Sequence, residues 1–287
     1  MANLRDIRRR IRSVKSTQQI TKAMKMVAAA KLRRAQERMF AARPYADKIQ
    51  KVLGSLAGRA EESLHPLLAV REEKKVVAGI ITADRGLCGA FNTNILRRST
   101  QFIKEHPGSE YDLSLAPIGR KARDFYRRRN HTVARDWSGI FRQIGVEHAE
   151  EIAGFFMETF SSGEADSVYL VYNEFKSVIR QEVVVQRLLP IEREELEEAA
   201  GQIDYIYEPN DKTIFEALLP RYVTFQVYRA LLESYAAEQA GRMTAMENAT
   251  NNAKDMIDAL TLHANRVRQA GITKELIEIV SGAEALE

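Results

Sequence analysis

The residues whose types and spacing come nearest to a chemical motif form the loop 84–92, which follows a short apolar run and contains two glycines. A glycine-rich loop between a strand and a helix can bind phosphate through its backbone N–H groups. This loop has neither GxGxxG nor GxxxxGK[ST] spacing, and no lysine follows its second glycine. The glycines therefore indicate a tight strand-to-helix turn, with nucleotide binding at residues 84–91 as an alternative.

Residue types that could support catalysis or metal binding are scattered along the chain. The single cysteine, Cys88, excludes an internal disulfide and fits a reducing compartment, and without a clear histidine partner it is typical of a small buried residue. The five histidines show no HxxH or HExxH spacing, so no metal site is expected. No GxSxG or Ser/His/Asp pattern is present. We therefore expect neither a catalytic site nor a cofactor.

Charge is distributed unevenly along the chain. Residues 1–60 contain 16 Lys and Arg against 3 Asp and Glu, a net charge of +13, whereas the whole chain carries only +4 and the rest therefore −9. The basic runs 8–10 and 31–34 could contact nucleic-acid phosphates or could simply be a solvated helix face. No recognised nucleic-acid module accompanies them, so an acidic protein partner is favoured over nucleic acid.

The N-terminal segment, residues 1–60, is expected to be one long helix ending near Gly54 or Gly58. Its apolar seam begins at heptad spacing with Leu4, Ile7, Ile11 and Val14. The same positions are small or apolar again at Ala28, Leu32, Ala35, Met39, Ala42, Ala46, Ile49, Leu53 and Leu56.

Two features of this helix predict irregularity. The seam positions Gln18, Thr21 and Lys25 are polar, while an apolar stripe is offset from them at Ile20, Met24 and Val27. The seam is therefore expected to slip. Pro44 is expected to kink or break the helix.

The C-terminal segment, residues 211–287, is expected to be a second long helix, because no proline follows Pro220 and only Gly241 and Gly271 interrupt the next fifty-odd residues. Its stripe is Ala236, Ala240, Met243, Met246, Ala249, Ala253, Met256 and Leu260. At 1.5 Å per residue the helix would span on the order of 90 Å, too long for a compact domain. The two terminal helices are expected to pair as an antiparallel coiled coil.

The central segment, residues 75–190, is predicted to be a separate α/β domain, because strand-like and helix-like patterns alternate along it. Strands are expected at residues 76–81, 113–116 and 131–137, and a hairpin at 168–186 that turns across 176–180. Helices are expected at 92–105, 121–129 and 147–160. Residues 191–210 are expected to be a linker or foot.

No segment is expected to cross a membrane, because the longest apolar run, residues 76–83, is far too short. The arginine-rich start also predicts no secretory signal. The least ordinary part is the final segment of the chain, residues 272–286, where an apolar strip continues beyond the reach of the α/β domain. Chain ends are usually polar, so this apolar end predicts a complementary binding site on a partner.

Three stretches, in this order, resemble the gamma-subunit family of F-type ATP synthases. They are residues 20–31 (ITKAMKMVAAAK), residues 84–89 (DRGLCG) and residues 272–285 (ITKELIEIVSGAEA), the last being the most specific. The resemblance covers essentially the whole chain. The cysteine insert of the chloroplast members is absent, so the chain resembles the bacterial type, with the α/β fold class of a long antiparallel coiled coil plus a central Rossmann-like domain.

The resemblance implies a central rotor shaft. In the family, the coiled coil stands inside a hexameric ring of alternating alpha and beta subunits, and the α/β domain contacts the epsilon subunit and the c-subunit ring. Rotation of the proton-driven ring is coupled to ATP synthesis on beta, so this chain would be non-catalytic. It would be a peripheral protein on the cytoplasmic face of the bacterial plasma membrane, without bilayer insertion. A coiled-coil scaffold with an α/β binding module is the alternative.

The resemblance also implies partner contacts at particular residues. Those expected to contact loops of beta are Arg8, Arg9, Arg33, Arg34, Arg268 and Gln269. Those expected to act as a bearing at the tip are Leu276, Ile279, Val280 and Ala283. Those expected to contact the c ring are Tyr205, Tyr207 and Glu208, for which a plain surface turn is the alternative.

Overall fold

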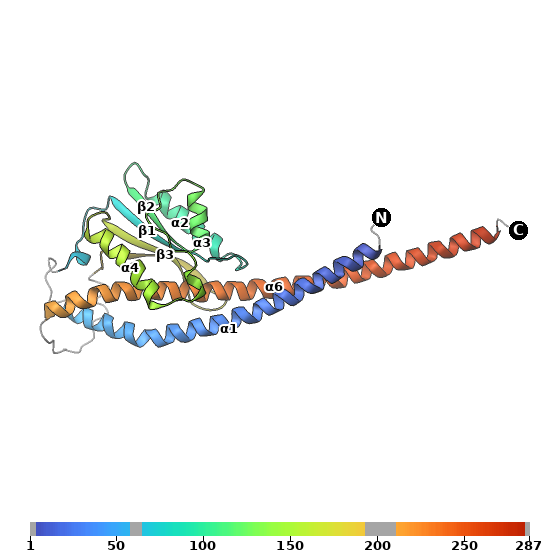
Figure 1. Ribbon diagram of the computed structural model, residues 1–287, viewed down its shortest axis with the longest axis horizontal. Helices are drawn as coiled ribbons and strands as arrows, with labels where there is room; N and C mark the ends of the chain where they lie inside the picture. The colour runs from blue at the N-terminus through green and yellow to red at the C-terminus, as the bar shows by residue number, and fades with distance from the viewer. Residues whose placement is uncertain (1–3, 58–64, 193–210, 285–287) are drawn as a thin grey trace. The chain divides into compact units, whose positions relative to one another are not determined.

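The computed structural model describes residues 4–57, 65–192 and 211–284. Its elements in order are α1 (Leu4–Ala57), η2 (Pro66–Leu68), β1 (Lys75–Ile81), α2 (Phe91–Glu105), β2 (Asp112–Ile118), α3 (Arg120–Arg127), η3 (Ile140–Arg142), α4 (Val146–Ser161), β3 (Ser167–Phe175), β4 (Gln181–Leu189) and α6 (Asp211–Glu284) (Figure 1).

The chain divides into two compact units. The helical unit comprises Met1–Ala28 and Arg242–Glu287, and the α/β unit comprises Ala29–Gly241. Both terminal helices contribute to both units, since the division falls within α1 and within α6. The sequence predicted four consecutive segments, residues 1–60, 75–190, 191–210 and 211–287. These segments follow the order of elements along the chain and differ from the two compact units, so their limits stay predictions.

In the helical unit α1 and α6 pair antiparallel, as expected. Thr21 Oγ1 lies 2.8 Å from Thr250 Oγ1, and one turn further along α1 Lys25 Nζ lies 2.6 Å from Glu247 Oε1. Residue numbers therefore rise on one helix as they fall on the other. Buried residues on α1 are Ile7, Thr21 and Ala28, and buried residues on α6 are Met246, Ala253 and Ala264. The expected coiled coil is confirmed.

The predicted slip in the seam is wrong. Thr21 is buried, whereas Ile20 and Val27 of the offset stripe are 57% and 55% exposed. Two of the three polar seam positions have a partner across the pair, Thr21 with Thr250 and Lys25 with Glu247, and these contacts keep the seam in register. A hydrogen-bonded polar residue fixes helix register at the expense of apolar contact.

The predicted break at Pro44 is also wrong, because α1 is one helix from Leu4 to Ala57 with Pro44 inside it. Proline removes one backbone hydrogen bond from a helix interior. Packing offsets that loss here, since Ile49 and Leu53 on the following turns are buried in the core of the α/β unit. Pro220 lies inside α6 in the same way, with Leu219 and Tyr222 buried beside it.

The α/β unit is built on a four-stranded sheet with the order β2-β1-β3-β4. Strand β1 is parallel to both β2 and β3, and β4 forms an antiparallel hairpin with β3. Apart from Lys75 at its start, every residue of β1 is buried, as expected for a central strand covered on both faces. The predicted α/β fold class and the hairpin are therefore confirmed.

Helices cover both faces of this sheet. Val77 and Ile81 of β1 belong to a core cluster that includes the end of α1, the inner face of α4 and the first third of α6. Val76, Ala78 and Ile80 point to the opposite face and belong to a second cluster with α2 and α3. The alternation of β1 side chains thus builds two hydrophobic layers. This is the Rossmann-like arrangement that was expected.

The predicted strand at residues 131–137 is wrong. This segment runs beside β2 but makes only two isolated bridges, Leu115 with Val133 and Ile118 with Trp137. Between the two bridges β2 contains Pro117, which has no N–H to donate. A continuous ladder therefore cannot form.

Candidate partner-binding surfaces

Beyond the first residue of α1, Leu4, helix α6 continues without a neighbouring helix among the described residues. In the register fixed by the Thr21–Thr250 contact, Leu4 falls opposite Val267. Val267 is partly buried, whereas every residue whose exposure is described from Arg268 to Ser281 is exposed. The last turns of α6 therefore have no covering helix within the helical unit.

This uncovered part of α6 contains the predicted tip. Leu276, Ile279 and Val280 are 57%, 67% and 63% exposed, and Ile272 is also exposed. Spacings of three and four residues place all four on one side of the helix. The side chain of Ala283 lies outside those described. The structure therefore leaves an apolar strip of these four residues, here called the tip, exposed to solvent.

Arg268 and Gln269 occupy the first uncovered turn of α6, and both are exposed. The backbone carbonyl of Gln269 accepts a hydrogen bond of 3.0 Å from Thr273 Oγ1, which continues the helix toward the tip. Their side chains are thus placed where a partner could reach them.

The four arginines expected to contact an acidic loop are not brought together as one cluster. Arg8 and Arg9 are exposed on the first turns of α1 in the helical unit, where Arg9 Nη2 pairs with Asp6 Oδ1 at 3.2 Å. Arg33 and Arg34 belong to the α/β unit. Arg33 Nε pairs with Glu37 Oε1 at 3.0 Å. Arg34 instead lines a pocket with Lys31 and Arg38.

The residues expected to contact the c ring, Tyr205, Tyr207 and Glu208, lie outside the described residues. Their assignment stays a prediction.

The loop 84–92 forms its own hydrogen-bond network. Asp84 Oδ1 accepts from the backbone N of Arg120 at 3.0 Å and of Gly139 at 2.9 Å. Asn92 Oδ1 accepts from the N of Ala83 at 3.0 Å, and Asn92 Nδ2 lies 3.2 Å from the buried Cys88 Sγ. Leu87 and Gly89 have positive φ angles of 63° and 60°. These features are typical of a structural turn.

Gly241 is the residue that sequence reasoning missed. A Cβ atom placed on it would lie 2.8 Å from the carbonyl oxygen of Cys88, closer than such contacts allow. The glycine therefore permits the loop 84–92 to pack directly on α6. The signal was present in the sequence as a glycine within an otherwise regular helix, but its partner there is distant in the chain and could not be identified.

The described part of the chain lacks two kinds of feature that would indicate function. Among those residues, no group of three or more His, Cys, Asp or Glu side chains is placed to hold a metal ion. Within the same ranges, the helices contain no stretch with the length and apolar character of a membrane span.

Comparison with known proteins assigns the family. A family model described as "ATP synthase" matches residues 3–286. The "ATP synthase gamma chain" of Pelotomaculum thermopropionicum is 54% identical over 287 residues and is covered completely, as is this chain. A chain in the central stalk and c-ring structure of Tetrahymena thermophila mitochondrial ATP synthase is 30% identical, with a TM-score of 0.62 over 80% of this chain and 99% of that one.

A chain of the Euglena gracilis mitochondrial ATP synthase shares the fold at a TM-score of 0.67, over 99% of this chain and 94% of that one, with 22% identity. The whole-length agreement in sequence and the shared fold lead to one conclusion. The chain belongs to the ATP synthase gamma-chain family.

Proposed function

We propose that this chain is the central rotor shaft of a proton-translocating F-type ATP synthase, which couples rotation of the c ring to ATP synthesis on the beta subunits. The observation that carries the proposal is an antiparallel helical pair from which α6 continues alone and ends in an exposed apolar tip. A self-contained enzyme or scaffold has no physical need for such an end, whereas a shaft that turns in a sleeve does.

A shaft changes the affinity of a beta subunit for nucleotide only if its contacts differ between rotational positions. Charge supplies this difference. In the helical unit the described part of α1 carries eight Lys and Arg with Asp6 as its one acidic residue, whereas α6 carries five basic and six acidic residues. An acidic loop of beta would therefore meet a basic side and a mixed side in turn. Arg8, Arg9, Arg33, Arg34, Arg268 and Gln269 are proposed to contact loops of beta.

The tip is proposed to act as a bearing. Apolar contact is non-directional, so it holds the shaft on axis without favouring one angle. Directional hydrogen bonds or ion pairs would instead create preferred stopping positions. Leu276, Ile279, Val280 and Ala283 are the proposed bearing residues.

The assembly that follows includes the alpha and beta subunits as a hexameric ring around the coil, with the epsilon subunit and the c ring near the α/β unit. Tyr205, Tyr207 and Glu208 are proposed to contact the c ring. ATP chemistry is proposed to occur on beta, so this chain carries no catalytic group and no cofactor. Its place is then the cytoplasmic face of the bacterial plasma membrane, as a peripheral subunit.

Single-molecule rotation tests the proposal. The alpha and beta subunits are fixed to a surface together with this chain carrying a probe at Ser109→Cys, an exposed position of the α/β unit; Cys88 is buried and remains unlabelled. ATP-dependent, one-directional rotation of the probe is expected. Sustained hydrolysis with a stationary probe, or full hydrolysis by alpha and beta without this chain, would contradict a rotor role.

The arginine assignment has a separate test in membrane vesicles. Reversing both Arg33 and Arg34 to Glu is expected to lower ATP-driven proton pumping more than ATP hydrolysis, because coupling is weakened. The matched control is Arg97→Glu, at an exposed arginine of α2 in the α/β unit. If both variants pump as the unchanged complex does, these arginines do not contact the moving loop.

A further inference from the structure

A basic pocket lies within the α/β unit between the middle of α1, the end of η3 and α6. Its volume is about 170 Å³. Its floor is apolar, because Ala35, Ile144 and Leu232 are buried. The pocket is therefore large enough for a small ion with some water.

Four cationic side chains line this pocket without acidic neighbours. They are Lys31, Arg34, Arg38 and Arg142. In the described part of the chain no carboxylate lies within the 4.0 Å of an ion pair from any of them, although Arg33 next in sequence is paired with Glu37. All four residues are exposed, so water and salt screen the attraction of each cation for an anion, and binding depends on several of them acting on the same anion.

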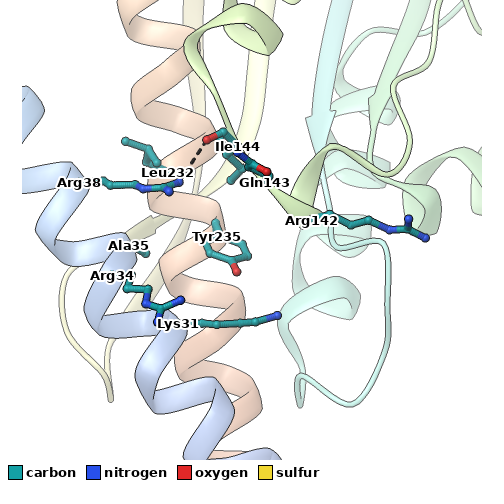
Figure 2. Close-up of a pocket in the computed structure, with 9 residues that line it drawn as sticks. All are labelled: Lys31, Arg34, Ala35, Arg38, Arg142, Gln143, Ile144, Leu232 and Tyr235. Atoms are coloured by element: carbon teal, nitrogen blue, oxygen red, sulfur yellow. Dashed lines mark hydrogen bonds between the residues drawn. The ribbon is translucent and has the colours of Figure 1, made fainter.

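The head groups are partly fixed. Arg38 Nη1 donates a hydrogen bond of 3.2 Å to the carbonyl oxygen of Ile144, which holds the guanidinium at the upper end of the pocket in Figure 2. In the same view the Tyr235 hydroxyl projects at the other end, with the Arg34 guanidinium on one side of it and the extended Lys31 side chain on the other, while Arg142 points its guanidinium away. The Tyr235 ring is held by stacking on Phe141, with centroids 6.5 Å apart and an interplanar angle of 17°.

The arrangement of donors selects among anions. Lys31 and Arg34 approach from α1, and the Tyr235 hydroxyl approaches from α6. Donors on two sides suit an anion whose acceptor oxygens point in several directions. A phosphate offers this, whereas a carboxylate has two oxygens in one plane and is satisfied by a single guanidinium fork.

We propose that this pocket binds a phosphate group, held by Lys31, Arg34 and the hydroxyl of Tyr235. The group is either free inorganic phosphate or the terminal phosphate of a nucleotide whose remainder stays outside. This binding does not depend on the chain being a rotor. Because Arg34 is also a proposed partner contact, phosphate bound here would compete with an acidic protein segment for one guanidinium.

The test uses the full-length chain with ¹⁵N-labelled arginine, titrated with inorganic phosphate at constant ionic strength. The arginine Nε–H signals are assigned by the single substitutions Arg33→Lys, Arg34→Lys and Arg38→Lys. A saturable shift of the Arg34 signal is expected, with half-saturation on the order of 1 mM, the range of weak specific binding. A shift that stays linear and affects all exposed arginines alike would mean non-specific ion pairing and would overturn the proposal.

Arg33 provides the matched control. It adjoins Arg34 in sequence and is also exposed, but it pairs with Glu37 and does not line the pocket. Arg34→Gln is expected to raise the half-saturating phosphate concentration at least tenfold, read by isothermal titration calorimetry, and Arg33→Gln by less than twofold. Equal effects of the two substitutions would refute the site. If Arg34→Gln changes the circular dichroism, Lys31→Gln replaces it, with the same expectation.

Two further arms separate the sources of the ligand. Acetate is expected to bind at least tenfold more weakly than phosphate; equal or tighter acetate binding would show a carboxylate site and overturn the proposal. ADP is the nucleotide probe. If ADP and phosphate shift the Arg34 signal with similar half-saturation, the pocket reads the phosphate group alone. A tenfold tighter ADP response identifies the nucleotide as the source, and a tenfold weaker one identifies free phosphate.

Discussion

The hydroxyl oxygens of Thr21 and Thr250 lie 2.8 Å apart across the pair of α1 and α6. Each is also within reach of a carbonyl oxygen of its own helix, 3.0 Å for Thr21 to Gln18 and 2.7 Å for Thr250 to Met246. A hydroxyl has one proton, so one threonine donates across the pair while the other donates within its helix. The contact is therefore a cross-helix hydrogen bond at a buried seam position.

Replacing either threonine by the isosteric valine is expected to lower the local opening free energy of the helical unit by about 0.5–1.5 kcal/mol, the net value of such a bond. Hydrogen exchange of amides near residues 21 and 250, read by mass spectrometry, measures this loss. In a double-mutant cycle the two losses are expected not to add. Fully additive losses would show that the two hydroxyls do not interact.

Gly241→Ala is expected to displace the loop 84–92 from α6, because the new Cβ would lie 2.8 Å from a backbone oxygen, which cannot swing aside as a side chain can. The expected loss is about 1–3 kcal/mol in the unfolding free energy of the α/β unit. Cys88, now buried, should become more reactive toward a thiol reagent.

The control for this substitution is Gly271→Ala on the uncovered part of α6, where no atom lies within 4 Å of the added Cβ. It is expected to be neutral or to stabilise the helix by up to about 1 kcal/mol, because alanine is the better helix former. Unchanged thiol reactivity of Cys88 in Gly241→Ala would show that the loop does not depend on the glycine.

Changing Leu276, Ile279 and Val280 together to serine is expected to leave unfolding of the isolated chain within about 0.5 kcal/mol of the original, because all three are exposed. Coupled ATP synthesis in vesicles is expected to fall several-fold, because the proposed bearing would lose its apolar surface. The control is Val70→Ser with Ile179→Ser, two exposed apolar residues of the α/β unit. An equal loss in the control would remove the tip from the mechanism.

Tyr172 makes stability depend on alkaline pH. Burial, followed by the charge of Glu233, raises the pKa of Tyr172 above its ordinary value near 10. Above about pH 10 the unfolded chain loses this proton while the folded chain keeps it, so stability falls as pH rises. Tyr172→Phe is expected to reduce this fall, although it costs about 1 kcal/mol at neutral pH by removing the bond to Gln186.

Urea unfolding at pH 8 and pH 11, followed by the fluorescence of the buried Trp137, measures the effect in the α/β unit. Some loss of stability with rising pH is expected to remain in Tyr172→Phe because of Tyr169. Burial and the hydrogen bond to Glu73 raise the pKa of Tyr169 to about 12. If Tyr172→Phe and the original chain lose equal stability between the two pH values, folding does not raise the pKa of Tyr172.

Periodicity predicted the fold wherever burial is one-sided or complete. The continuous apolar run at β1 and the heptads of α1 were interpreted correctly, because each pattern reports directly on which side chains leave water. The predictions were wrong where the local structure depends on a residue that is distant in the sequence. Thr21 and Lys25 are polar residues at seam positions, and from the sequence alone they predict a shift of the seam. The structure shows that Thr250 and Glu247 face them across the pair. Segment 131–137 has strand-like residues, but it lies against Pro117.

The partner surfaces were less accessible to sequence reasoning. The apolar character of the tip was visible, but its exposure depends on where α1 starts relative to α6, which only the register reveals. Arg33 and Arg34 are indistinguishable in sequence, yet one is paired with Glu37 and the other lines a basic pocket. Gly241 could not be connected with Cys88, because nothing local links them.

The uncovered end of α6 also affects how the free chain behaves in solution. Ile272, Leu276, Ile279 and Val280 form a patch that water meets directly whenever the chain is alone. Two copies can hide these patches against each other, so the free chain is prone to self-association. A partner that covers these four residues would remove this tendency, so self-association is expected to reach its maximum when the chain is free.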